Sequence, residues 1–223
     1  MSKPVRFFAV LSVTCLPALL TARADDAAPP AAGHPSATPA HQIGEPAPVF
    51  QLRIVNNQEG GPRLFDLRSY VGDDAEHPAK LLLVSFFATW CKPCKAELPE
   101  LVRMAATYKD AGLQIVSIAI DKDKEGIDKI PDIVKANSVV HPVISDSMNI
   151  VARRYLGSDV KLPSLVMVGR DGNILSLHQG YGDDLKASLE GEVRHLLGLP
   201  PLVSDATADK DSKSKHKKHA DND

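Results

Sequence analysis

The stretch FFATWCKPCKAELPEL, residues 86–101, holds two cysteines, Cys91 and Cys94, with a lysine and a proline between them. The apolar run at residues 81–87 that leads into the pair is typical of a strand covered on both faces. Residues 92–110 then have a helical composition with apolar positions along one face. The pattern therefore predicts a buried strand that leads into a helix, with the first cysteine at the junction.

This junction favours a reactive thiol at Cys91. The free N–H groups and the positive dipole end of a helix N-terminus stabilise a thiolate, and reactive cysteines with a pKa below the free value of about 8.5 arise in this way. Lys92 and Lys95 add positive charge, and Pro93 is tolerated in the first helical turn, where it stiffens the link between the sulfurs. Cys94, one turn later, is expected to be more buried and to resolve a mixed disulfide formed by Cys91.

Other uses of the cysteine pair fit the sequence less well. A disulfide staple would close a loop of only two intervening residues and so would stabilise the fold very little. A structural zinc site needs about four ligands, and the third cysteine, Cys15, lies in the segment predicted below to be removed. A haem attachment motif would have histidine where Lys95 stands. Thiol–disulfide chemistry remains, with no metal and no cofactor expected.

The rest of the chain predicts an α/β fold with a central mixed β-sheet, flanking helices and an added N-terminal β-hairpin. The hairpin strands are expected at residues 49–55 and 63–67, around a Gly60-Gly61-Pro62 turn. Gly112 is expected to stop the helix that follows the cysteines, and Asp183 to cap the last helix. The further strands are expected at residues 113–120, 143–144, 165–168 and 174–179, and the further helices at 124–137, 147–155 and 183–197.

The two ends of the chain differ from this pattern. Residues 1–24 combine a basic start, an apolar run and a small-x-small site, which predicts a signal peptide cleaved after Ala24 and a periplasmic or secreted protein. An uncleaved membrane anchor is the alternative, disfavoured because the apolar run is short and interrupted by Pro17. An Ala/Pro-rich flexible leader at 25–42, a folded domain at 43–199 and a charged, disordered tail at 200–223 follow.

The charge of the chain gives little sign of a charged partner. The formal net charge of the whole chain is −2, and cleavage after Ala24 leaves 23 basic against 28 acidic residues, a net charge of −5. A mildly acidic domain is a poor ligand for nucleic acid, so no nucleic-acid partner is expected.

Three motifs together carry a resemblance to a known family. Trp90-Cys91-Lys92-Pro93-Cys94 is similar to the WCxPC motif of the thioredoxin superfamily, and residues 86–101 resemble the exported TlpA/ResA-like thiol–disulfide oxidoreductases. Pro99 stands where that family has a proline within its active-site helix. Leu162-Pro163 resembles the family's cis-proline loop, and the likeness extends over roughly residues 43–199.

The resemblance implies a function and a set of site residues. Cys91 would attack a disulfide of a protein substrate and Cys94 would resolve the mixed disulfide. Trp90, Pro93, Leu162 and Pro163 would contact the substrate, a protein with a disulfide or a dithiol. A membrane-embedded or other thiol electron donor would recycle the pair.

The sequence departs from thioredoxin at one position that matters for proton transfer. Thioredoxins have a buried aspartate six residues before the first cysteine, where this chain has Ser85. ResA-like members have a glutamate three residues after the second cysteine, which Glu97 matches, so Glu97 is predicted to accept the proton of Cys94. The alternative for Glu97 is a solvated helix carboxylate, and the alternative for Trp90 is an ordinary core side chain.

Two other functions remain as alternatives. A peroxiredoxin-like thiol peroxidase shares the fold, but its Pro-x-x-x-Thr/Ser-x-x-Cys setting is missing. Val84, seven residues before Cys91, replaces the proline, and Ala88, three residues before, replaces the threonine or serine. A metallochaperone could hold Cu(I) on the two thiolates, with His178 and Met167 as candidate further ligands.

Overall fold

The computed structural model describes residues 42–57 and 59–202. The predicted signal peptide, nearly all of the predicted leader and the tail from residue 203 onward lie outside these residues. Within the described ranges, no helix is long and apolar enough to cross a membrane.

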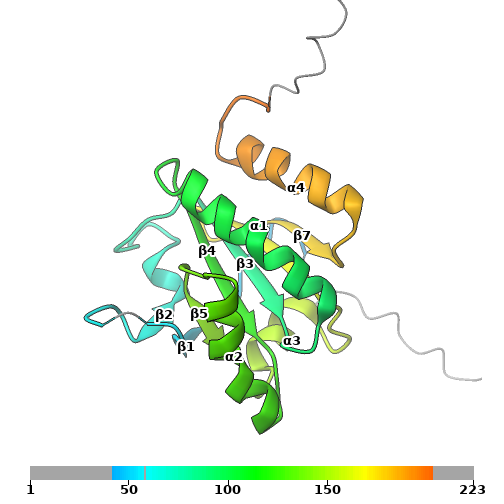
Figure 1. Ribbon diagram of the computed structural model, residues 1–223. Helices are drawn as coiled ribbons and strands as arrows, with labels where there is room; N and C mark the ends of the chain where they lie inside the picture. The colour runs from blue at the N-terminus through cyan, green and yellow to red at the C-terminus, as the bar shows by residue number, and fades with distance from the viewer. Residues whose placement is uncertain (1–41, 58, 203–223) are drawn as a thin grey trace, which may run out of the picture. The chain divides into compact units, whose positions relative to one another are not determined.

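A five-stranded mixed sheet forms the centre of the fold, in the order β5-β4-β3-β6-β7 (Figure 1). The middle strand β3, Leu81–Phe87, is buried along its whole length, as its continuous apolar run predicts. It pairs in parallel with β4, Leu113–Ala119, and antiparallel with β6, Ser164–Gly169. The outer strands are β5, Val143–Ser145, and β7, Ile174–Gln179.

In the described part of the chain, four α-helices accompany the sheet: α1, Lys92–Tyr108; α2, Lys124–Ala136; α3, Ile150–Leu156; and α4, Asp183–Leu196. One apolar cluster joins α1 and α4 to the sheet, and a second brings in α2, α3 and the N-terminal hairpin. The predicted fold class is therefore confirmed.

The α1 and α4 helices are also tied together by polar contacts. Arg103 of α1 forms ion pairs with Glu100 on its own helix, at 2.5 Å, and with Glu190 of α4, at 2.6 Å. The Tyr108 hydroxyl donates a hydrogen bond to the same Glu190 carboxylate. The α1 helix therefore has a fixed neighbour along its C-terminal half.

The predicted N-terminal hairpin is present but shorter than expected. Its strands are β1, Gln51–Arg53, and β2, Leu64–Asp66, which form a separate antiparallel sheet, and a short 3-10 helix η1, Leu67–Ser69, follows. The end of the first strand reaches the main sheet through a bridge between Ile54 and Ile144.

Two predictions about helix ends were wrong. The N-cap of α4 is Gly182, not Asp183, which is already the first helical residue. The α1 helix ends at Tyr108, before Gly112. Gly112 instead has a φ of +100° and donates its N–H to the Lys109 carbonyl, which makes the tight turn into β4.

Candidate active site

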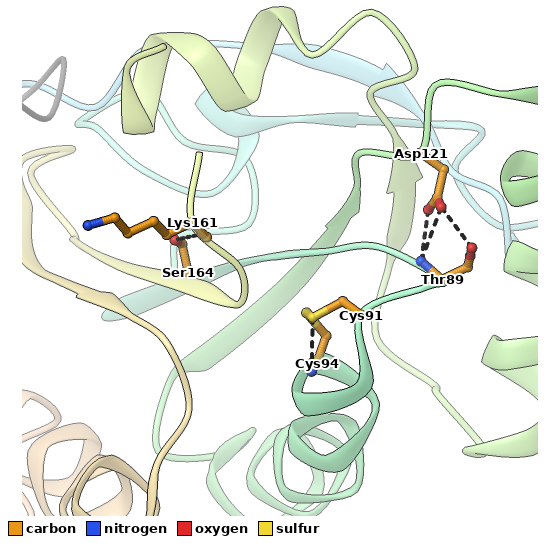
Figure 2. Close-up of a disulfide and its surroundings, with 6 residues drawn as sticks. All are labelled: Thr89, Cys91, Cys94, Asp121, Lys161 and Ser164. Atoms are coloured by element: carbon orange, nitrogen blue, oxygen red, sulfur yellow. Dashed lines mark hydrogen bonds between the residues drawn. A yellow bond between two sulfur atoms is a disulfide. The ribbon is translucent and has the colours of Figure 1, made fainter. Parts of the chain in front are cut away.

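The cysteine pair lies at the junction that the sequence predicts. β3 ends at Phe87, three residues follow, and Cys91 is the N-cap residue of α1. Its sulfur is joined to Cys94 by a disulfide of 2.03 Å and accepts a hydrogen bond from the Cys94 N–H at 3.2 Å (Figure 2). Cys94 is buried in the first turn of α1, with Cys91 only slightly more accessible. One backbone N–H at the helix start, that of Cys94, therefore points toward the sulfur of Cys91.

The loop that ends at Pro163 lies close to the cysteine pair because of the sheet register. Phe86, near the end of β3, is paired with Ser164, the first residue of β6, so the residues just before β6 reach the end of β3 that carries the cysteines. Figure 2 shows this loop opposite the disulfide, held by a hydrogen bond from the Ser164 hydroxyl to the Lys161 carbonyl. The Leu162–Pro163 peptide bond is cis, as the resemblance implied.

An open hollow of about 540 Å³ lies beside this loop and Trp90. Trp90 is 68% exposed, so the alternative that it is an ordinary core tryptophan is wrong. The apolar part of the lining comes from Trp90, Ile120, Val160 and Leu162, whereas Pro163 is buried. The rest of the lining is polar or charged and includes Lys122, Asp123 and Arg153. An exposed indole beside a hollow of this mixed character gives an extended polypeptide a surface to contact.

Glu97 is deeply buried. It lies on α1 one turn after Cys94, and the residue is only 1% exposed, so the alternative of a solvated carboxylate is wrong. Among the described residues, no side chain or backbone group forms a hydrogen bond with its Oε1 atom. Loss of hydration raises the pKa of Glu97 to about 8, because burial disfavours the charged form.

Ser85 lies where thioredoxins have their buried aspartate, and it is completely buried in β3. Along β3, Leu83 and Ser85 point to the same face of the sheet. Leu83 packs in the cluster that contains Leu101 of α1, and Glu97 stands one helical turn before Leu101. Ser85 therefore lies on the sheet face that α1 covers, where a neutral hydroxyl takes the place of the thioredoxin carboxylate.

Sequence reasoning missed two buried polar contacts near the site. Asp121 accepts hydrogen bonds from both the N–H and the hydroxyl of Thr89, two residues before Cys91. His141 shares a hydrogen bond of 2.9 Å with the Ser117 hydroxyl, and burial lowers the pKa of this histidine to about 4. The only signal for Asp121 was its position directly after a buried strand, where side chains meet those of neighbouring strands.

The candidate copper ligands are engaged elsewhere. The His178 ring shares a hydrogen bond of 2.7 Å with Glu192 of α4. Met167 is fully buried in the apolar cluster that also contains Leu189 and Val193 of α4. Within the part of the chain that the structure describes, no three His, Cys, Asp or Glu side chains are placed to hold a metal ion.

The central sheet, the disulfide at the start of α1 and the cis-proline loop together define a thiol–disulfide oxidoreductase of the thioredoxin superfamily. The chain belongs to the AhpC/TSA family, which it matches over residues 43–176.

Curated relatives agree with this class. The thiol-disulfide oxidoreductase ResA of Bacillus anthracis is 30% identical over 156 residues, which cover 70% of this chain and 79% of that protein. ResA of Bacillus thuringiensis subsp. konkukian is 29% identical over 149 residues, covering 67% of this chain and 75% of that protein. The predicted TlpA/ResA-like membership is therefore confirmed.

Solved structures share the fold. A candidate thiol:disulfide interchange protein DsbE from Chlorobium tepidum superposes with a TM-score of 0.59 at 24% identity, over 70% of this chain and 99% of that chain. The thioredoxin domain of a thiol-disulfide oxidoreductase from Bacteroides vulgatus gives a TM-score of 0.53 at 22% identity, over 69% and 99%.

Proposed function

We propose that this protein is exported and exchanges thiols and disulfides with extracytoplasmic protein substrates through Cys91 and Cys94. The observation that carries the proposal is the position of the pair: Cys91 is the N-cap of α1, its sulfur accepts the Cys94 N–H, and the cis-Pro163 loop lies opposite. A thiolate at this position is stabilised by the helix N-terminus, and the loop leaves room for a polypeptide.

The exchange begins with the reduced pair. The Cys91 thiolate attacks one sulfur of the substrate disulfide, a Cys91–substrate disulfide forms, the substrate S–S bond breaks, and the departing sulfur leaves as a thiolate that takes up a proton. Cys94, whose backbone N–H lies 3.2 Å from the Cys91 sulfur, is the adjacent thiol. Its deprotonated sulfur attacks Cys91, releases the second substrate thiolate and forms the Cys91–Cys94 disulfide.

Glu97 is the proposed proton acceptor for Cys94. It lies on the same helix one turn later, and its buried carboxyl has a pKa of about 8. A carboxyl with this pKa holds or releases a proton near neutral pH, which suits a group that takes the proton of a thiol and later returns it. Trp90, Pro93, Leu162 and Pro163 are the proposed substrate contacts around this pair.

We infer that the protein works as a reductant. Its Cys91–Cys94 disulfide would then be reduced by a membrane-embedded or other thiol donor, which supplies two electrons and two protons per cycle. The predicted signal peptide at residues 1–24 supports a periplasmic or secreted location. The reduction potential tests the direction: a value near that of thioredoxin, about −270 mV, supports a reductant, whereas a value near that of DsbA, about −120 mV, reverses it.

Cysteine variants test the mechanism. We expect Cys91→Ser to abolish reduction of insulin disulfides, because the nucleophile is lost, and Cys94→Ser to trap substrates as mixed disulfides visible on non-reducing gels. A variant of an exposed lysine at the far end of the same helix, Lys109→Ala, is the control and should retain exchange. Insulin reduction by the Cys91→Ser protein would refute the mechanism.

The wild type and the Cys91→Ser variant also distinguish a thiol–disulfide oxidoreductase from a thiol peroxidase. Val84 and Ala88 stand where the peroxidase motif has its proline and its threonine or serine, and both are fully buried and apolar. We therefore expect the wild type to consume hydrogen peroxide no faster than a small free thiol at the same concentration. Rapid peroxide consumption that Cys91→Ser abolishes would favour a peroxidase instead.

A further inference from the structure

A buried carboxylate holds the segment that leads into the cysteine pair. Asp121 has no exposed surface, and its two oxygens accept the Thr89 N–H at 3.0 and 3.2 Å. The Thr89 hydroxyl donates a third hydrogen bond to the same carboxylate at 2.7 Å. Figure 2 shows this contact beside the Cys91–Cys94 disulfide. Hydrogen bonds to a carboxylate are stronger than those between neutral groups, so the three contacts together hold Thr89 in place.

The contact arises where two parallel strands end side by side. β3 and β4 pair up to Phe87 and Ala119, and the Ile120 N–H extends the ladder to the Phe87 carbonyl. Beyond this point the backbone of Thr89 no longer follows the ladder, and its N–H is bound by the Asp121 side chain instead. Asp121 therefore binds the backbone of the segment that follows β3, where this segment leaves the sheet.

The other side of the carboxylate is closed by α2. A Cβ atom built on Gly126, in the first turn of α2, would lie 2.6 Å from the Asp121 Oδ1 atom and 3.0 Å from its Cβ. Atoms that close must move apart, so only glycine fits beside the carboxylate as it stands. Asp121 is thus held between Thr89 and the start of α2.

The fixed segment continues directly to the nucleophile. The Cys91 N–H donates to the Ala88 carbonyl at 3.1 Å, so residues 88–91 form one tight turn around Thr89. This turn sets where the Cys91 sulfur lies relative to the Cys94 N–H that it accepts. A displacement of Thr89 would therefore pass to the sulfur through only two residues.

We propose that Asp121 is a positioning residue, which holds the Thr89–Cys91 turn so that the Cys91 sulfur meets the Cys94 N–H at the start of α1. The inference rests on the proposed function of Cys91 as the nucleophile. Asp121 does not contact the sulfurs and acts only through Thr89.

Alanine and glycine substitutions test the contact from both sides. Asp121→Ala removes the acceptor, and Gly126→Ala keeps the carboxylate but displaces it. We expect both to slow insulin reduction at least tenfold and to move the pH midpoint of Cys91 alkylation by iodoacetamide upward by about one unit, because the thiolate loses its N–H donors. Asp121→Asn, which can still accept the Thr89 N–H, should recover most of the rate.

Asp146→Asn is the matched control. Asp146 is also a buried aspartate just beyond a parallel strand, but it accepts the N–H groups of Ile150 and Ala152 at the start of α3 and does not contact the Thr89–Cys91 turn. We expect this variant to lose thermal stability without a change in the alkylation profile. Lys92, Lys95 and Glu97 are identical in every variant, so a shift between variants reports the Asp121 contact.

Each outcome decides the proposal. If the alkylation profile of Gly126→Ala is the same as that of the wild type, the positioning role of Asp121 is refuted. This test holds even if Asp121→Ala does not fold. An equal shift in Asp146→Asn shows general loosening, and an equal shift in Asp121→Asn shows a charge effect; either refutes positioning. Alkylation of the reduced protein does not require exchange activity. A wild type that reduces no protein disulfide would therefore refute the proposed function. The alkylation shifts would still test the role of Asp121 in that case.

Discussion

The Glu97 side chain is the clearest case of a residue whose chemistry depends on its surroundings. A glutamate in water ionises near pH 4.5, but burial on the inner face of α1 raises the pKa of Glu97 to about 8. At neutral pH the carboxyl is therefore mostly protonated, and its charged form increases as the pH rises through 8. A proton acceptor for Cys94 with this pKa makes the resolving step faster toward alkaline pH.

We expect Glu97→Gln to remove this pH dependence and to slow the resolving step at pH 8 at least tenfold, since general base catalysis typically contributes about 10²-fold or more. Stopped-flow release of glutathione from a Cys91–glutathione mixed disulfide measures the step. Glu100→Gln, on the same helix but paired with Arg103, is the control. An unchanged rate and pH profile in Glu97→Gln would exclude the proton-transfer role.

At the scale of the element, α1 both carries the site and anchors it. Its buried positions recur about one turn apart and include Cys94, Glu97, Leu98, Leu101, Met104 and Tyr108. Pro99 lies within the helix and has no N–H to donate to the Lys95 carbonyl, but it faces solvent. The buried face of α1 thus carries Cys94 at its N-terminal end, near the loop at Pro163, and apolar side chains further along, which pack in the core.

The α4 helix depends on its buried leucines. Leu189 is completely buried in the cluster that also contains Leu101 and Met104 of α1. We expect Leu189→Ala to reduce the free energy of unfolding by about 2–5 kcal/mol, because it leaves a cavity. Urea unfolding measures the loss, and Met148→Ala, at a residue that is 70% exposed, should change stability by less than about 0.5 kcal/mol. Equal effects of the two substitutions would contradict this packing.

At the scale of the whole molecule, two buried groups give opposite slopes to stability against pH. The pKa of His141 falls from 6.5 to about 4, so between these values the unfolded chain binds more protons and stability rises with pH. The pKa of Glu97 rises from 4.5 to about 8, so there the folded chain holds the proton and stability falls with pH. The two effects on stability oppose each other up to pH 6.5. Above pH 6.5 only the decrease in stability caused by Glu97 remains.

We therefore expect the free energy of unfolding of the oxidised protein to decrease by about 2 kcal/mol between pH 6.5 and 8, since one pKa unit corresponds to about 1.4 kcal/mol. Urea titrations at several pH values measure the decrease. Glu97→Gln should abolish it, whereas His141→Gln should leave it in place and extend the fall to lower pH. A wild type whose stability does not change over this range would contradict the burial of an acidic Glu97.

Features that depend on neighbouring residues could be predicted from the amino-acid sequence alone. The strand that leads into a helix at Cys91, the spacing of the two cysteines, the N-terminal hairpin and the Leu162-Pro163 dipeptide can all be read within short segments. These features follow from local periodicity and from the special backbone of proline and glycine. They were sufficient to predict the α/β fold and to select the redox pair.

Which polar side chains are buried away from water, and what they contact, depends on how distant segments pack in three dimensions. Four features depend on segments that lie far apart in the chain. They are the burial of Glu97, the exposure of Trp90, the hydrogen bonds from Thr89 to Asp121 and the Ser117–His141 hydrogen bond. Sheet register and helix packing bring these segments together, and desolvation then sets the pKa of each buried group. A linear pattern of residues carries neither the register nor the loss of hydration.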